Sequence, residues 1–228
     1  MIESLGFFGD AAVVSQSTQG SKSRRSIRDA EKTKQHILDA AEIEFAKHGL
    51  KGARTDRISK TAGVASRMIY YYFESKEGLY QTVLQRSATG IQNAIASIDL
   101  ENVSPDRALA EVIRAAIIYE MQYRHRGMLL FQEANQNQGK YFTNMNWQPA
   151  IDLLTNILDR GVKTQVFRPL DSYMTTLNII GVCVFYGNAH ENLKHITPKK
   201  NLLSEESIEQ YVRSTIELVL NGVKNSLI

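Results

Sequence analysis

The sequence predicts an all-α protein of about nine helices. Three observations support this fold class. Apolar residues recur three and four positions apart over most of the chain, as they do on one face of a helix. No segment makes a credible strand. The breaks between the periodic segments are short, and most contain glycine or proline.

Residues 1–28 are expected to form a flexible basic arm. After a short apolar patch, the segment is rich in serine, glutamine and glycine and has no usable periodicity. Arg24, Arg25 and Arg28 lie at its end, directly before the first expected helix. Two interpretations stay open for these arginines: they contact a DNA backbone or minor groove, or they are solvated without a specific contact.

The first folded helix is expected over residues 29–47. Gly49 is placed to end it, because glycine is the usual residue after a helix terminus. The helix would pack against the two short helices that follow. Its apolar stripe consists of Ile37, Leu38, Ala41 and Phe45.

Two short helices joined by a tight turn are expected next. Thr55 can cap the first, whose Ile58 faces inward. Gly63 permits the sharp turn, and Val64 fills its corner. The arrangement is a helix-turn-helix.

The second helix of this motif is expected from about Ser66, which would supply its cap. Ile69 and Phe73 are four positions apart and would face the core. The opposite face is the one that a helix-turn-helix places in a DNA groove.

The whole segment resembles the amino-terminal pattern of the TetR/AcrR family of transcriptional regulators. The resemblance covers roughly residues 30–86. One position departs from it, because Ala65 stands where the family usually has serine or threonine. The resemblance implies a DNA-binding domain over residues 29–80 and a helical domain over 81–228 for effector binding and dimerisation. The matching positions are the helix 37–52, Thr55, Ile58, Ala62, Gly63, Val64, Ile69, Tyr70, Tyr72, Phe73 and the segment 75–79.

The residues expected to contact DNA divide by role. Tyr70 is expected to meet a phosphate, because the family uses the matching tyrosine in this way. Lys76, Thr55 and Arg57 are also expected at phosphates, since each lies near the start of a helix. Arg67 is the candidate for base recognition, because its planar guanidinium can bond O6 and N7 of guanine. Further candidates are Ser66, Met68, Tyr71 and Tyr72, the last equally open to a packing role.

Six more helices are expected, at residues 79–98, 105–123, 127–138, 146–163, 171–193 and 204–224. Ser104 would cap the second of these, with Pro105 at its first position. The segment 179–185 is apolar on all sides, and the last helix carries a stripe of small or branched residues. The resemblance implies that helices 171–193 and 204–224 form a four-helix interface in a homodimer; burial within one subunit is the alternative. The stripe consists of Ile208, Val212, Thr215, Val219 and Gly222.

The middle helices are candidates for enclosing a small-molecule pocket, with aromatic walls and a few polar groups such as Glu120. Ordinary core packing is the competing interpretation. The resemblance favours a pocket but does not identify the effector. The candidate ligand-binding residues are Tyr119, Tyr123, Phe131, Trp147, Phe185 and Asn188.

Charge is concentrated in the expected DNA-binding segment. Residues 22–86 hold 14 Lys or Arg against 8 Asp or Glu, whereas the whole chain has a net charge of only +3. The rest of the chain is therefore mildly acidic. A basic module attached to an acidic body is typical of a protein that neutralises phosphates with one end.

Several function classes are disfavoured. The five histidines lack the spacing of a metal site, and the single Cys183 cannot form a disulfide within one chain. No catalytic motif, metal or cofactor is expected, so an enzyme is disfavoured. No apolar run is long enough to span a bilayer, which favours a cytoplasmic protein without a membrane partner.

Two functions remain. The first is a ligand-responsive regulator, usually a repressor in this family, that binds a pseudo-palindromic double-stranded DNA operator as a dimer. The alternative is an architectural or constitutive DNA-binding protein without a small-molecule effector.

Overall fold

The computed structural model describes residues 16–96 and 98–225, with side chains from residue 27 onward. Within these ranges the chain is all-α, as predicted: it forms nine α-helices, one 3-10 turn and no strand. The elements are α1 (Gln16–Gly52), α2 (Thr55–Ala62), α3 (Arg67–Phe73), α4 (Lys76–Ala96), α5 (Pro105–Gln122), α6 (Arg124–Asn137), η1 (Phe142–Asn144), α7 (Gln148–Lys163), α8 (Ser172–Ile196) and α9 (Glu205–Val223).

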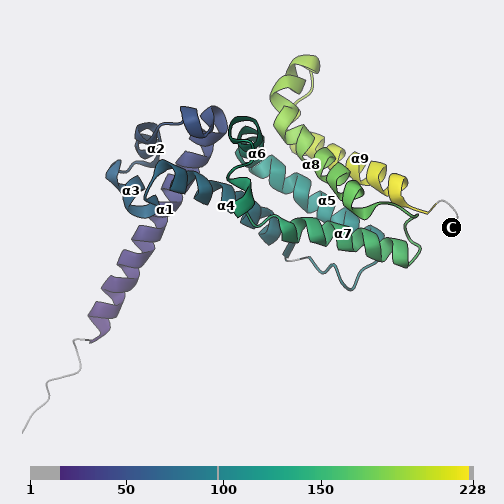
Figure 1. The fold of residues 1–228 in the computed structure, drawn as a ribbon, viewed down its shortest axis with the longest axis horizontal. Helices are drawn as coiled ribbons and strands as arrows, with labels where there is room; N and C mark the ends of the chain where they lie inside the picture. The colour runs from purple at the N-terminus through teal and green to yellow at the C-terminus, as the bar shows by residue number, and fades with distance from the viewer. Residues whose placement is uncertain (1–15, 97, 226–228) are drawn as a thin grey trace, which may run out of the picture.

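The helices form two parts, which we call the head and the body (Figure 1). The head consists of α1, α2, α3 and the first turns of α4; the body consists of α5 to α9 and the rest of α4. The helix α4 runs from one part into the other, and the amino-terminal half of α1 projects away from the body (Figure 1). This arrangement makes α4 and α6, which packs against α1, the connections between the two parts.

Each part has its own apolar core. In the head, Phe45 of α1 and Tyr80 of α4 meet edge to face with ring centroids 4.9 Å apart. Leu129 of α6 is fully buried in the same core. The body core is aliphatic and joins α5 to α4, α7, α8 and α9. The head core therefore contains residues of the body, and the two parts share an interface.

The first helix begins earlier than predicted. We expected a flexible arm to residue 28, but α1 begins at Gln16 and already includes Arg24, Arg25 and Arg28. Residues 1–15 of the expected arm lie outside the described residues. Hydrophobic periodicity could not detect the extension, because its residues have no apolar stripe. The Gln, Lys and Arg residues of the segment do favour a helix by intrinsic propensity.

Gly49 breaks α1 as the sequence predicts. Its φ of 63° and ψ of −179° are not helical, and a single further turn follows it. A side chain on Gly49 would also collide with Gln136 of α6. The glycine is therefore required both by its backbone conformation and by the close approach of α6.

Of the three predicted helix caps, Ser66 and Ser104 occupy the cap positions but make no side-chain cap bond, and the Thr55 cap is wrong. Thr55 is the first residue of α2, and Arg54, in extended conformation, occupies the cap position without a side-chain bond to the helix backbone. Ser66 precedes α3 but is itself helical, and its Oγ bonds Ser59 Oγ at 2.9 Å. Ser104 also makes no side-chain cap bond, although Pro105 does begin α5. The hydroxyl groups of Thr55 and Ser66 instead bond Tyr70 OH and Ser59 Oγ, whereas Ser104 bonds the nearby Asp106 side chain.

Candidate functional site

The turn between α2 and α3 is fixed by backbone hydrogen bonds. Gly63 has left-handed dihedrals, φ 69° and ψ 31°, and its N–H bonds Lys60 O at 3.2 Å. The N–H of Val64 bonds Ser59 O at 3.0 Å. Ile58 and Ile69, one on each helix, are fully buried. The inward faces of both helices are thus fixed, and the other face of α3 is turned to solvent.

The outward face of α3 is polar and aromatic. Tyr70 and Tyr71 are 51% and 76% exposed, although apolar burial would be the default for such rings. Arg67 is exposed and makes no hydrogen bond or ion pair with any residue that the structure describes. Met68 and Tyr72 are half-buried and pack against the head core. The helix therefore presents Arg67, Tyr70 and Tyr71 outward.

The other expected DNA contacts lie around this helix. Thr55 Oγ1 and Tyr70 OH are 3.3 Å apart, so the start of α2 adjoins the middle of α3. Arg57 is exposed and 3.9 Å from Glu44. Lys76 is the first residue of α4, and its Nζ donates to Lys51 O at 3.5 Å.

The three arginines expected on the arm lie in α1 instead. Arg28 is exposed. The side chains of Arg24 and Arg25 lie outside the part of the chain whose side chains are described.

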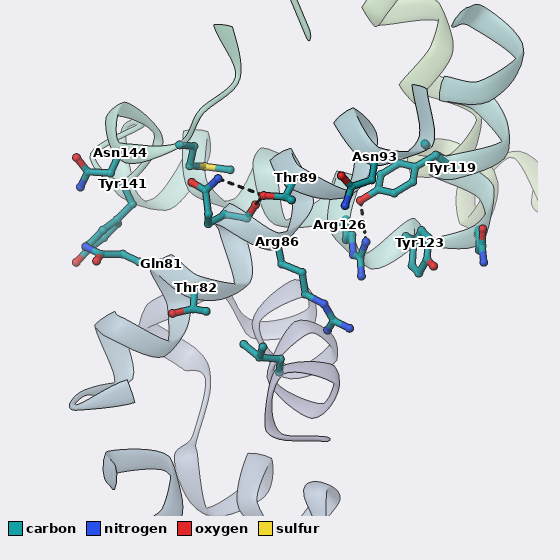
Figure 2. A pocket seen from close by; sticks show the side chains of 16 residues that line it. Gln81, Thr82, Arg86, Thr89, Asn93, Tyr119, Tyr123, Arg126, Tyr141 and Asn144 are labelled. Atoms are coloured by element: carbon teal, nitrogen blue, oxygen red, sulfur yellow. Dashed lines mark hydrogen bonds between the residues drawn. The ribbon is translucent and has the colours of Figure 1, made fainter. Parts of the chain in front are cut away.

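A buried ion pair joins the head to the body. Arg126 of α6 donates from Nε to Glu42 Oε2 of α1 at 3.0 Å and from Nη1 to Tyr119 OH at 2.7 Å. Tyr119 in turn donates to Ser87 O of α4 at 3.2 Å. The guanidinium carbon also lies 3.9 Å from the ring centroid of Tyr123 (Figure 2). Sequence analysis did not identify Arg126, because its partner Glu42 is 84 positions away.

A second buried carboxylate holds α6 against α4. Glu133 accepts hydrogen bonds from Tyr80 OH at 3.0 Å, Asn137 Nδ2 at 2.6 Å and Tyr141 N at 2.7 Å. Burial, followed by the charge of Glu133, raises the pKa of Tyr80, so this hydroxyl stays a donor at neutral pH. Both buried carboxylates of the junction are therefore fully engaged.

An open polar groove of about 900 Å³ lies over the junction. Figure 2 shows its side chains, which come from α4, from α5 and α6, from the segment around η1 and, through Leu38, from α1. Tyr119 and Tyr123, both candidate ligand residues, line this groove, as does Arg126.

A smaller and more enclosed cavity of about 250 Å³ lies inside the body. It is bounded by α4, α5, α7 and α8, with single residues from α6 and η1, and is lined almost entirely by apolar side chains. Trp147, a candidate ligand residue, lines it, and Glu120 is the one charged group in its described lining. Most of its wall is aliphatic, including Ile91, Ile95, Val112, Leu154, Leu177 and Ile180. Sequence analysis did not identify these residues, since an aliphatic stripe looks the same whether it faces a core or a cavity.

The six candidate ligand residues do not form one site. Phe131 and Phe185 are 54% and 58% exposed and line neither the groove nor the cavity. The amide nitrogen of Asn188 is buried without a hydrogen bond in the described structure.

The described residues contain neither a membrane-spanning helix nor a cluster of metal-binding side chains. No helix there is long and apolar enough to cross a membrane. No group of three or more His, Cys, Asp or Glu side chains is arranged to hold a metal ion.

A helical body that carries a helix-turn-helix with an exposed second helix defines a DNA-binding transcriptional regulator. Two family models match the chain: "Bacterial regulatory proteins, tetR family" over residues 37–83, and "Tetracyclin repressor-like, C-terminal domain" over residues 105–219. The chain belongs to the tetR family.

Similar proteins agree with this assignment. The transcriptional repressor NicS of Pseudomonas putida is 29% identical over 206 residues, which cover 86% of this chain and 95% of NicS. The regulator RutR of Escherichia coli is 25% identical over 84% of this chain and 90% of RutR. A tetR-family regulator from Rhodococcus RHA1 has a TM-score of 0.70 at 16% identity over 85% of this chain and 98% of that structure, which shows a common fold.

Proposed function

We propose that the protein is a repressor that binds a pseudo-palindromic operator as a homodimer and leaves it when a small molecule occupies the apolar cavity. The observation that carries this proposal is the path of α4. Lys76 begins the helix beside the helix-turn-helix, whereas Ile91 and Ile95 of the same helix line the cavity. A ligand that moves the cavity end of α4 would displace the head as well.

The fold of the body supports an effector site. FadR of Bacillus subtilis, whose structure was solved in complex with stearoyl-CoA, has a TM-score of 0.64 at 22% identity over 82% of this chain and 98% of that chain. A body of this fold can therefore hold a small molecule. Of our ligand candidates, we propose that Trp147 contacts the effector directly, while Tyr119 and Tyr123 transmit its effect at the junction.

The surface of α8 and α9 supports the dimer. Leu177 and Phe185 on α8 and Leu218 on α9 are 39%, 58% and 66% exposed. A side chain built on Gly181 or Gly222 would meet nothing nearby, so both helices offer flat positions to a partner. We call this surface the seam. It differs from the stripe that we expected on the last helix, because Val212 and Thr215 of that stripe are buried within the subunit.

For the phosphate contacts, Tyr70→Phe and Lys76→Ala should each weaken binding to operator and to unrelated DNA by similar factors. Both groups would meet the backbone, which is the same in every sequence. Lys76→Ala should also reduce the salt dependence by about one counterion per subunit. Fluorescence anisotropy at several salt concentrations measures both effects, and a loss restricted to the operator would assign these residues to base recognition.

If Arg67 recognises a base, Arg67→Ala should weaken the free energy of operator binding by about 1 to 3 kcal/mol per half-site. The loss of binding free energy on random DNA should be much smaller. Arg67 is free of intramolecular partners in the described structure, so its guanidinium is available to a guanine. A binding-site selection with both proteins would show relaxed preference at one base pair. Equal losses on both DNAs would instead make Arg67 a phosphate contact.

The proposed function is tested by combining two assays. The protein is screened against small molecules by thermal shift, and each stabilising compound is added to an operator complex. A repressor of the proposed kind gives compounds that raise the melting temperature and release the operator. If every stabilising compound leaves DNA binding unchanged, the protein is a constitutive DNA-binding protein instead.

A further inference from the structure

Glu120 is placed on the cavity-facing side of α5. Ile113, Ala116 and Glu120 follow one another at spacings of three and four, so they share one face of the helix. All three line the apolar cavity. A carboxyl group therefore continues a stripe that is otherwise aliphatic.

This carboxyl group has no partner within the described structure. Glu120 makes no hydrogen bond and no ion pair there, in contrast to Glu42 and Glu133, the two buried carboxylates of the junction. Burial raises the pKa of Glu120 to about 7, against the more distant charge of Arg126, which lowers it. Glu120 is partly buried, and desolvation of its carboxylate that no hydrogen bond offsets lowers the stability of the fold.

The packing around Glu120 keeps the position open. A side chain on Gly127 of α6 would come within 2.7 Å of Glu120 Oε2 and within 2.9 Å of Asn188 Nδ2 of α8. Because Gly127 has no side chain, α6 can pack beside this carboxyl oxygen without displacing it. The other described lining residues from α4, α7 and α8 carry no charge.

We infer that the cavity takes a small molecule with an apolar body and one protonated amine, and that the amine pairs with Glu120. This inference rests on the proposed function, in which the cavity is the effector site. An ammonium group would donate to the unpaired carboxylate and offset its desolvation. A carboxylate ligand would meet a like charge, and a neutral ligand would offer at most a hydrogen bond from an uncharged donor, which is weaker than one from an ammonium group.

The cavity also limits the size of the ligand. Its volume of about 250 Å³ is below the usual range for drug-sized ligands. A single ring with a short aliphatic chain is the appropriate scale for a probe.

Binding of an amine should strengthen as pH rises from 6 to 8. The titratable or charged groups near Glu120 are Tyr119 on α5, Arg126 on α6 and Cys183 on α8. Burial raises the pKa of Tyr119 and raises that of Cys183 to about 12, and the pKa of Arg126 is also raised. Between pH 6 and pH 8 Glu120 gains a negative charge, whereas these three neighbouring groups keep their charge states. An alkylamine stays protonated over the same range.

The test compares three probes with the same apolar body: 3-phenylpropylamine, 3-phenylpropanol and 3-phenylpropanoate. We expect the amine to bind the full-length protein at pH 8 on the order of tenfold more tightly than the alcohol, with the acid weakest. Titration calorimetry measures all three. In Glu120→Gln the preference for the amine and its pH dependence should disappear, whereas Glu111→Gln on the same helix should retain both, because Glu111 lies outside the cavity lining.

Ala116→Leu provides a second control. The larger side chain fills part of the cavity and should weaken the binding of all three probes. Equal binding of amine and alcohol, tighter binding of the acid, or no binding of the amine would overturn the inference. An amine that binds through Glu120 but leaves the operator complex intact would instead show that a ligand in this cavity does not release the operator. Conversely, operator release by compounds without a cationic group would support the proposed function and reject this ligand class.

Glu120→Gln should also change stability in a pH-dependent way. A carboxyl group whose pKa is raised in the folded state destabilises the fold as pH rises through that value. The variant should therefore gain melting temperature over the parent protein at pH 8 and lose this advantage near pH 5. If the two proteins differ in melting temperature by the same amount at pH 5 and at pH 8, Glu120 is ionised and well solvated, which contradicts the inference.

Discussion

Leu218→Glu should convert the dimer to a folded monomer. Operator affinity should fall by about 100-fold or more, because a dimer that binds both half-sites gains at least this factor over a single subunit. Leu218 is 66% exposed on α9 in the single subunit, so the subunit's own core does not need it. At the centre of a dimer seam, however, a glutamate would be buried without a partner. Sedimentation and DNA binding measure the two effects, and circular dichroism verifies the fold.

The choice of residue matters for this experiment. Val219, a member of the stripe expected on the last helix, packs partly against the body core, so a charge there would also destabilise the subunit. Ile118→Glu on α5 is the matched control, because Ile118 is 41% exposed but lies outside α8 and α9. A Leu218→Glu monomer that binds the full operator with unchanged affinity would refute the symmetric dimer. A Leu218→Glu dimer would place the seam elsewhere.

Arg126→Ala should lower the free energy of unfolding by about 3 to 5 kcal/mol, the usual loss when one partner of a buried ion pair is removed. Arg126 is 6% exposed and Glu42 is 7% exposed. Without the guanidinium, Glu42 would keep only a longer contact of 3.5 Å from Arg86, and Tyr119 OH would lose a donor. Urea denaturation of the full-length protein measures the loss.

Arg114→Ala is the control for this prediction. Arg114 binds Glu209 with two hydrogen bonds of 2.8 and 2.9 Å, but both side chains are about 40% exposed. Arg114→Ala should therefore lower the free energy of unfolding by about 1 kcal/mol or less. Similar losses for Arg126→Ala and Arg114→Ala would show that the junction pair is solvated and does not hold the head to the body.

The helix-turn-helix was predictable because its determinants are local. Gly63, Ile58 and Ile69 lie within twelve positions of one another, and turn chemistry and helical spacing fix their roles. The break at Gly49 was predictable for the same reason. The start of α1 was not, since residues 16–28 have no apolar stripe to mark them.

The ligand residues were harder to predict because one sequence does not say what each helix face meets. Phe185 was expected at a pocket but lies on the outer surface of α8. Trp147 and Glu120 do line the cavity, yet residues from five helices are needed to enclose it. Arg126 carries no sequence signal for its role, because that role depends on an ion pair to a distant helix.

The shared core of head and body has a consequence for protein engineering. A chimaera joined after residue 80, where the DNA-binding domain was expected to end, would transfer Glu42 without Arg126 and Tyr80 without Glu133. It would also remove Leu129 from the apolar core that contains Phe45 and Tyr80. New operator specificity is therefore better introduced by grafting the outward residues of α3 alone, or by exchanging α6 together with the head.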